Sequence, residues 1–187
     1  MKISRCTANS GPTHEASCSC VGGNTCPLQE DIRHSNRMVV EVNGECYCGQ
    51  VKFTASVPAD DEAVEKSVAF TAYCHCGDCK RAHSSPLYQV AMIVADGFRY
   101  TQGEELVNHY RKSAETGPER SFCSVCGTRM TIQYRSIKVE GKPTIGLFPA
   151  LLDDAMQHSL PKSLQPKKLN KPDSSTLDFE LLTGSSK

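Results

Sequence analysis

Alternating apolar and polar positions are the main pattern along the middle of the chain, and they predict strands. Residues 51–57 (VKFTASV) and 128–134 (TRMTIQY) change between apolar and polar at nearly every step, which is typical of strands with one buried face. Further short strands are expected at segments rich in β-branched and aromatic residues: 68–73, 88–94, 98–100, 106–110 and 144–152. A helical period is nearly absent, and only residues 77–83 could form one or two helical turns. The pattern therefore predicts an all-β domain of about seven or eight short antiparallel strands with little helix.

The two ends of the chain lack this pattern. Residues 1–37 are rich in Ser, Thr, Asn, Gly and Cys, and we expect a low-complexity extension there. From His158 the chain turns to Pro, Lys and Ser, which predicts a poorly ordered tail over 158–187, or at most one wrapped over the surface. These boundaries leave residues 38–157 as the folded domain. Within it, the pair Asn43-Gly44 predicts a turn.

Seven of the eleven cysteines lie within the predicted domain in three close groups. The groups are Cys46 and Cys48, then Cys74, Cys76 and Cys79, then Cys123 and Cys126. A structural zinc ion takes four thiolates, whereas a catalytic zinc ion takes three protein ligands and leaves one position open. Seven thiols therefore fit one closed site and one open site. We expect unligated, flexible thiols at the other four cysteines, which are Cys6, Cys18, Cys20 and Cys26.

Disulfide bonds are the competing use of paired cysteines. The chain starts with polar residues rather than with the apolar run of a secretion signal, and no segment approaches the ~18 apolar residues of a membrane span. We therefore expect a cytoplasmic protein with reduced cysteines, for which this pattern favours metal binding. The 21 basic residues balance the 21 acidic residues, which argues against nucleic acid or a membrane surface as the main partner.

The spacing of the groups leaves the partners within each site open. C-S-V-C-G at 123–127 is typical of a zinc knuckle, in which Gly127 supplies a positive φ. This knuckle could pair with the C-x-x-C of the middle group, or with the first group, which would leave the middle group as a compact three-ligand set. His83, four residues after Cys79, could also complete the middle site. His75 lies between two ligands, and strand alternation turns it away from them, so we expect it behind the ligands or at the surface.

Three ordered motifs resemble those of the glutathione-dependent formaldehyde-activating enzymes, a family that includes centromere protein V. They are G-E-C-Y-C-G-Q-V-K-F at 44–53, C-H-C-G-D-C-K-R at 74–81 and R-S-F-C-S-V-C-G-T at 120–128. The resemblance implies a β-tent fold similar to that of methionine sulfoxide reductase B. It also implies two zinc ions, a structural one on Cys46, Cys48, Cys123 and Cys126 and a catalytic one on Cys74, Cys76 and Cys79.

The family reaction joins formaldehyde to the thiol of glutathione and reverses as a carbon–sulfur lyase. The resemblance therefore implies a zinc-dependent lyase that acts on a thiol–aldehyde adduct of the S-hydroxymethylglutathione type, with a small thiol as its partner. Cations near the open site would offset its negative charge and bind the carboxylates of glutathione, and the candidates are Lys80, Arg81 and Arg120. Family members usually carry a His or an aromatic residue near the end of the domain, and residues 161–170 lack one.

Two other functions fit the same resemblance, because a fold does not fix a function. The first is a non-catalytic, zinc-stabilised protein-binding module, since centromere protein V suggests a cytoskeletal or chromatin role. Such a module would need an interaction tail, for which the lysine-containing residues 162–171 are the candidate. The second is sulfoxide reduction, which would need a reactive core cysteine free of metal, and all seven grouped cysteines are expected to bind metal.

Overall fold

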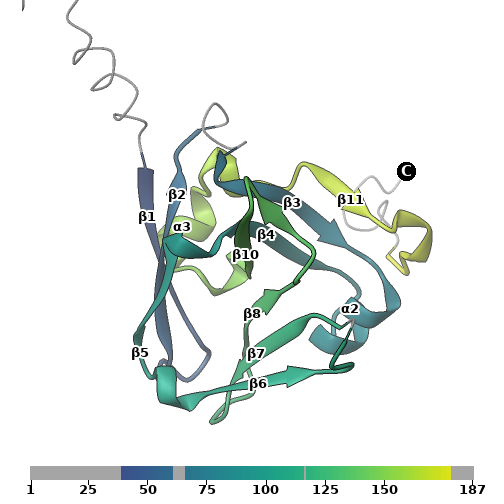
Figure 1. The fold of residues 1–187 in the computed structure, drawn as a ribbon, viewed down its shortest axis with the longest axis horizontal. Helices are drawn as coiled ribbons and strands as arrows, with labels where there is room; N and C mark the ends of the chain where they lie inside the picture. The colour runs from purple at the N-terminus through teal and green to yellow at the C-terminus, as the bar shows by residue number, and fades with distance from the viewer. Residues whose placement is uncertain (1–38, 61–65, 116, 178–187) are drawn as a thin grey trace, which may run out of the picture. The chain divides into compact units, whose positions relative to one another are not determined.

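A computed structural model describes residues 39–60, 66–115 and 117–177, and the predicted extension over 1–37 lies outside them (Figure 1). The strands are β1 (Val39–Glu45), β2 (Lys52–Pro58), β3 (Val68–Cys74), β4 (Tyr88–Val94), β5 (Phe98–Gln102), β6 (Val107–Arg111), β7 (Glu119–Cys123), β8 (Arg129–Gln133), β9 (Lys138–Val139), β10 (Lys142–Leu147) and β11 (Lys168–Asn170). The helices are α2 (Gly77–His83) and α3 (Asp154–His158), with short 3-10 turns η2 (Ala95–Gly97), η3 (Glu104–Leu106), η4 (Pro149–Leu151), η5 (Lys162–Leu164) and η6 (Pro172–Ser174).

The strands form two sheets. The smaller sheet has the order β1-β2-β5, and the larger has the order β11-β3-β4-β10-β8-β7-β6, with β9 paired to β10. Among the described strands, neighbours pair antiparallel except β11 and β3, which run parallel. The all-β prediction is confirmed, and so is the short helix predicted at 77–83. The finer β-tent assignment stays a prediction.

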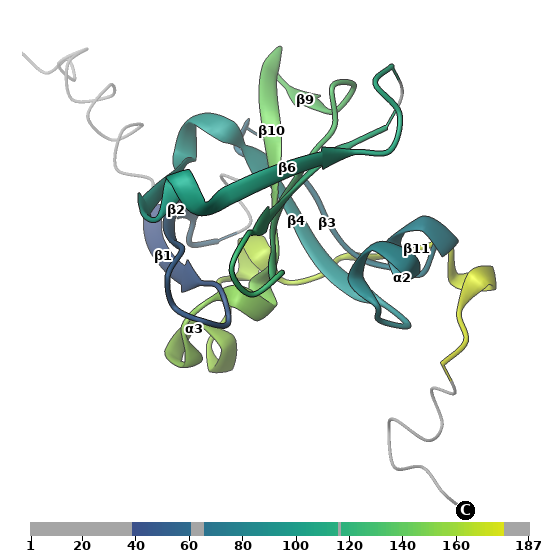
Figure 2. The ribbon, with the colours of Figure 1, turned by 90° about the horizontal axis from the view of Figure 1, so that it is seen from below.

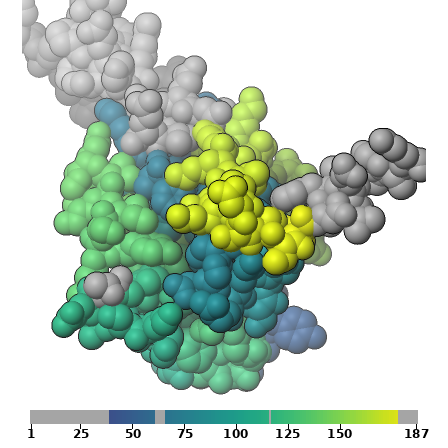
Figure 3. Space-filling view, turned by 90° about the vertical axis from the view of Figure 1, so that its right-hand side faces the viewer, coloured from purple at the N-terminus to yellow at the C-terminus, as the bar shows by residue number. Residues whose placement is uncertain are grey.

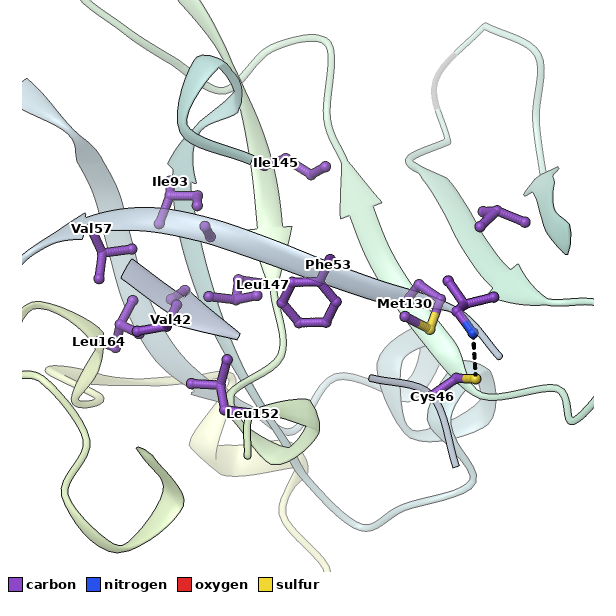
Figure 4. Close-up of a cluster of buried hydrophobic side chains, with 14 of the residues drawn as sticks. Val42, Cys46, Phe53, Val57, Ile93, Met130, Ile145, Leu147, Leu152 and Leu164 are labelled. Carbon is purple, nitrogen blue, oxygen red and sulfur yellow. Dashed lines mark hydrogen bonds between the residues drawn. The ribbon is translucent and has the colours of Figure 1, made fainter. Parts of the chain in front are cut away.

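The main core is built by the inward faces of both sheets, as the alternation predicted (Figure 4). Its labelled members come from β1, β2, β4, β8, β10 and the two segments around η4 and η5: Val42, Phe53, Val57, Ile93, Met130, Ile145, Leu147, Leu152 and Leu164. Each such side chain stabilises the fold by ~1.5–3 kcal/mol when it is fully removed from water. Cys46 and Cys123 belong to the same cluster, so one cysteine group is continuous with the core.

The turn predicted at Asn43-Gly44 is wrong, because both residues lie inside β1. Gly44 pairs with Phe53 of β2, and a Cβ at Gly44 would lie against the Phe53 ring and 2.6 Å from the backbone oxygen of Leu151. The glycine is therefore needed for close approach of neighbouring atoms rather than for a turn. The chain turns later, between Cys46 and the start of β2, where Cys46 N–H donates to the carbonyl of Val51 at 2.9 Å.

For residues 158–177, the part of the tail that the structure describes, the chain is held along the domain, which is nearer to the second expectation of a segment wrapped over the surface than to a poorly ordered one. Leu164 in η5 is fully buried, and the Thr71 hydroxyl donates to the carbonyl of Gln165 at 2.6 Å. β11 then pairs with β3, with Lys168 opposite Ala72. The polar composition hid this segment because hydrogen bonds hold much of it, and only a few apolar side chains, such as Leu164 and the partly buried Leu160, pack against the core. In the space-filling view the segment, in yellow, lies over the blue and teal region of β3 and α2 (Figure 3).

Neither α2 nor α3, nor any other helix in the described ranges, has the length and apolar character needed to cross a bilayer.

Candidate metal centres and binding pocket

The first cysteine cluster joins two hairpin bends that are far apart in the sequence. Cys46 and Cys48 follow β1, whereas Cys123 ends β7 and Cys126 precedes β8, and their four Sγ atoms all lie within 4.8 Å of one another. The Sγ atoms of Cys46 and Cys48 are 3.4 Å apart, and those of Cys48 and Cys123 are 3.9 Å apart. Zinc–sulfur bonds of ~2.3 Å in a tetrahedron separate the sulfurs by about 3.8 Å. This set therefore fits a closed tetrahedral zinc site.

Both bends are shaped by positive-φ glycines and by backbone hydrogen bonds. Gly127 has φ 77° and donates its N–H to the carbonyl of Cys123 at 2.8 Å. Gly49 has φ 71° and donates to the carbonyl of Cys46 at 2.8 Å. The N–H of Val51 donates to Cys46 Sγ at 3.3 Å, the dashed line in Figure 4. Each bend thus turns its sulfurs toward a common point, as the knuckle prediction for 123–127 required.

Hydrogen bonds also favour the thiolate form of two of these cysteines. Burial raises the pKa of Cys46, but the Val51 N–H and the neighbouring thiols outweigh burial and leave that pKa below its usual value. At Cys126 burial again raises the pKa, but hydrogen-bond donors on Thr128 outweigh burial and lower the pKa to about 6. The Thr128 hydroxyl lies 3.2 Å from Cys126 Sγ. Thiolates are the metal-binding form of cysteine, so these contacts prepare the cluster for a cation.

The second cysteine cluster lies where β3 runs into α2. Cys74 ends the strand, Cys76 is the N-cap of the helix and accepts the N–H of Cys79 at 3.4 Å, and Cys79 lies within the helix. The three Sγ atoms lie within 4.8 Å of one another. Cys74 and Cys79 are buried and Cys76 is half-buried. Three thiols fit a zinc ion that keeps one position for another ligand.

The pKa values within this second cluster diverge. Burial opposes ionisation of Cys76, but N–H and thiol donors from Cys79 and Cys74 outweigh it and lower the pKa of Cys76. At Cys79 burial and the neighbouring thiols raise the pKa to about 12. Cys76 therefore ionises more readily than Cys79, and a cation bound beside Cys79 would be needed to ionise it at neutral pH.

The alternative in which His83 completes the second site is not supported. Among the described residues, the second group of potential ligand atoms contains the three cysteines alone. The His83 ring instead stacks on Tyr88, with centroids 4.1 Å apart, and meets the edge of Phe148. Burial, followed by the charges of Arg120 and Arg129, lowers the pKa of His83 to about 4, so its ring is neutral at neutral pH.

Sequence reasoning left the position of His75 open between two alternatives and missed two other residues beside the ligands. His75, expected behind the ligands or at the surface, is fully buried. Tyr73, next to Cys74, is 36% exposed. Tyr88 was not predicted as part of the site, although its hydroxyl forms a hydrogen bond with Cys79. Asn170 was not predicted either, and its side-chain amide donates to Cys74 Sγ at 3.2 Å. No motif marks either residue, because each reaches the cluster through the folding of strands distant in sequence.

The structure separates the three cations that were predicted to bind substrate. Arg81 and Arg120 line a cavity of about 530 Å³ beside α2, together with Lys112, Arg129 and Asp78, whose carboxylate pairs with Arg81 and Lys112. Lys80 is not among the residues that line this cavity, and its Nζ donates to the carbonyl of Ser174 at 2.6 Å. The cavity is thus a cationic pocket beside the helix that carries Cys79, and sequence reasoning missed Lys112 and Arg129 as parts of it.

Arg120 is the distinctive residue of this cationic pocket. It is 7% exposed, and its Nε atom is buried without a hydrogen-bond partner in the described part of the chain. Arg81, by contrast, is exposed and pairs with Asp78 at 3.1 Å. A buried guanidinium with an unused donor favours an anionic ligand, because an unpaired buried donor costs free energy that a carboxylate would recover.

Two comparisons with known proteins gave matches. A sequence model of the glutathione-dependent formaldehyde-activating enzymes matches residues 41–168, a range that contains all seven clustered cysteines. This match confirms the resemblance carried by the three motifs. Among solved structures, a protein of Rhodobacter sphaeroides aligns with 68% of this chain and 99% of its own length, at 21% sequence identity and a TM-score of 0.47.

Proposed function

Because this chain belongs to the family of glutathione-dependent formaldehyde-activating enzymes, we propose that it is a zinc-dependent carbon–sulfur lyase. Its substrate is an adduct of a small thiol with an aldehyde, of the S-hydroxymethylglutathione type. The observation that carries the proposal is the unequal size of the two cysteine clusters, four sulfurs in one and three in the other. A purely structural role would favour two closed sites, whereas a three-sulfur set leaves a position for the thiol of the substrate.

The residues divide into two roles. Cys46, Cys48, Cys123 and Cys126 would hold a structural zinc ion, and Cys74, Cys76 and Cys79 would hold the catalytic one. When bound by three thiolates, zinc supplies a Lewis acid that favours the deprotonated form of an incoming thiol and polarises a carbonyl group. The reducing conditions of the cytoplasm would keep all seven thiols available for this purpose, and we propose that compartment as the place of action.

The reaction needs no oxidant or reductant. In the forward direction the sulfur of glutathione forms a bond to the carbon of formaldehyde, the electron pair of the C=O bond moves to oxygen, and the thiol proton ends on that oxygen. The reverse direction breaks the carbon–sulfur bond and returns the proton to sulfur. The protein therefore has to bind a thiol and an aldehyde together in the right orientation, which can supply a large part of the rate enhancement of such a reaction.

We assign the carboxylates of glutathione to the cationic pocket formed by Arg81, Lys112, Arg120 and Arg129. A cavity of about 530 Å³ lies within the usual range of ~300–1,000 Å³ for small-ligand sites. Arg120 would anchor one carboxylate, because its guanidinium is buried and matches a carboxylate with two parallel hydrogen bonds. Arg81 is exposed at the pocket rim and would contribute less. We propose that Lys80 does not bind the substrate but holds the C-terminal segment through its hydrogen bond to the Ser174 carbonyl.

Exchange spectroscopy tests this proposal, because formaldehyde and glutathione also combine without a catalyst. The rate of exchange between free glutathione and its hydroxymethyl adduct would be measured by NMR with ¹³C-formaldehyde, with and without protein. We expect faster exchange with the wild type and the uncatalysed rate with Cys76→Ser. The variant Cys26→Ser, which changes a thiol outside the two clusters, is the control and should match the wild type. Equal rates with and without the wild-type protein would contradict the lyase function and leave the binding-module alternative.

A further inference from the structure

We propose that Asn170 is a positioning residue of the three-cysteine centre, and that strand β11 completes this centre by holding the Cys74 ligand through the Asn170 side chain. The amide Nδ2 of Asn170 donates to Cys74 Sγ at 3.2 Å. The inference rests on the metal centre of the proposed function and extends it to a residue beyond the part of the chain that the family model matches, which ends at residue 168.

The parallel pairing of β11 with β3 brings Asn170 to this position. Asn170 lies opposite Cys74 in the strand register, and Leu169 lies opposite Tyr73. The backbone carbonyl of Asn170 accepts the N–H of His75 at 3.0 Å. One residue therefore binds two successive positions of the ligand segment, the sulfur of Cys74 through its side chain and the amide of His75 through its backbone. Figure 1 shows β11 beside β3, and Figure 2 shows β3 running toward α2.

Burial of apolar surface does not explain why β11 lies there. All three of its residues are exposed, whereas the sulfur that Asn170 contacts belongs to a residue that is 3% exposed. The strand is held on both sides by other contacts: Leu164 packs in the core before it, and Lys80 Nζ donates to the carbonyl of Ser174 at 2.6 Å after it. Lys80 follows Cys79 in α2, so the C-terminal segment contacts both elements that carry the three cysteines.

A hydrogen bond donated to a coordinated sulfur affects both the net charge of the metal centre and the strength of the bond between sulfur and metal. Three thiolates around one zinc ion leave a net charge of −1, and a hydrogen bond to one of them offsets part of it. The same bond withdraws electron density from the sulfur, weakens its donation to the metal and fixes its orientation. Cys76 accepts such a bond from the backbone of its own helix. Cys74 accepts it from a side chain 96 positions away, so the centre depends on the C-terminal segment.

Metal release and the cobalt spectrum test the proposal in the full chain. Asn170→Leu removes the donor at nearly constant size, and Asn170→Asp keeps the shape but replaces the donor by an acceptor. Removal of an outer contact of this kind typically weakens metal binding ~10–100-fold. We therefore expect a chelator to remove one of two zinc ions roughly ten-fold or more faster from both variants, with release of the other ion unchanged. In the Co²⁺-substituted protein, the sulfur-to-cobalt charge-transfer bands should move to longer wavelength as Cys74 becomes the stronger donor.

Leu169→Ala is the matched control, because it changes the neighbouring position of the same strand and leaves the amide in place. Its metal release and cobalt bands should equal those of the wild type. Unchanged bands and release in both Asn170 variants would overturn the proposal. An equal shift in Leu169→Ala would overturn it too, because the effect would then come from the strand and not from the amide.

The test separates this inference from the proposed function, because its readouts do not depend on turnover. Spectral shifts in the Asn170 variants, in a protein that does not accelerate exchange of the glutathione adduct, would support the role of Asn170 and contradict the lyase. If the wild type accelerates exchange of the glutathione adduct but the cobalt bands are the same in the Asn170 variants, the lyase function would be supported and the role of Asn170 contradicted.

Discussion

The two cysteine clusters differ in how much of the fold depends on them. The four-cysteine cluster joins the bend after β1 to the bend between β7 and β8, and thus connects the small sheet to the large one. Cys46 and Cys123 of this cluster belong to the main apolar core. The three cysteines of the second cluster, by contrast, all lie within the six residues 74–79, at one strand-to-helix junction. A site that links distant segments stabilises the fold, whereas a local site can be altered for chemistry at small structural cost.

Loss of a cysteine should show this contrast most strongly. Cys123→Ser removes a ligand that bridges the two sheets, so we expect loss of one zinc ion and of cooperative thermal unfolding, since zinc binding contributes ~10–16 kcal/mol in structural sites. Cys76→Ser should also lose one zinc ion but keep a cooperative transition. Zinc analysis with circular dichroism during heating measures both. Similar unfolding curves for the two variants would contradict the division of roles.

Replacement of the buried arginine tests the pocket beside the second cluster. Arg120→Met should raise KM for the glutathione adduct ~10–100-fold, because a hydrogen bond between charged groups contributes ~1.5–3 kcal/mol and each 1.4 kcal/mol is a factor of ten. The effect on kcat should be small if the carboxylate binds equally in the ground and transition states.

Arg99→Met serves as the control, since Arg99 pairs with Glu41 on the small sheet at 2.9 Å and is exposed. Its KM should stay at the wild-type value. A KM for Arg120→Met that also equals the wild-type value would remove Arg120 from the substrate site.

The pH dependence of stability should sharpen the contrast further, through His83 beside the second cluster. The pKa of His83 falls from the usual 6.5 to about 4 in the folded protein. As the pH falls below 6.5, His83 therefore becomes protonated in the unfolded chain but stays neutral in the folded chain down to about pH 4. The free energy of unfolding consequently decreases as the pH falls from 6.5 to 4. His83→Phe keeps the stacking on Tyr88 and should show a smaller loss of stability across that window.

Urea unfolding at several pH values measures this difference. Acid also releases zinc from both variants, so the comparison is the difference between variant and wild type at each pH rather than either curve alone. Parallel curves from pH 6.5 to 4 would show that His83 does not have the lowered pKa.

The smallest effect is expected at the exposed contact between α2 and the C-terminal segment. Lys80→Met removes the hydrogen bond to the Ser174 carbonyl, which contributes ~0.5–1.5 kcal/mol at most to the free energy of unfolding. We expect a fall in Tm of a few degrees in differential scanning calorimetry and an unchanged zinc content. Arg81→Met, at the next position of α2, loses only its exposed pair with Asp78 and should change Tm less. A larger fall in Tm for Arg81→Met than for Lys80→Met would contradict the view that Lys80 makes the more stabilising contact.

The parts that could be predicted from the sequence are those with a local cause. Strict alternation marked β2 and β8, and the C-x-x-C-G spacing marked the knuckle that ends at Gly127, because period and turn chemistry act within a few residues. Spacing could not decide which bends meet at the four-cysteine cluster, since that depends on how two sheets pack. The pairing came instead from the resemblance to a family, and the structure brings those four sulfurs together.

The errors have a common physical reason. Asn43-Gly44 has the composition of a turn, but its glycine is required by the approach of the Phe53 ring across the strands. The chain after His158 has the composition of a disordered segment, but its backbone groups pair with β3. Composition reports on side chains, and in both places the decisive contacts involve the backbone or the absence of a side chain.

The parallel pairing of β11 with β3 also sets the order of events during synthesis. A ribosome releases the chain from its N-terminus, so both sheets apart from β11 can assemble, and all seven clustered cysteines can emerge, while residue 170 is still inside the exit tunnel. The centre at the end of β3 therefore receives the Asn170 contact only after every other strand that the structure describes has been synthesised, and a nascent chain arrested before Asn170 would load metal into a site that lacks this donor.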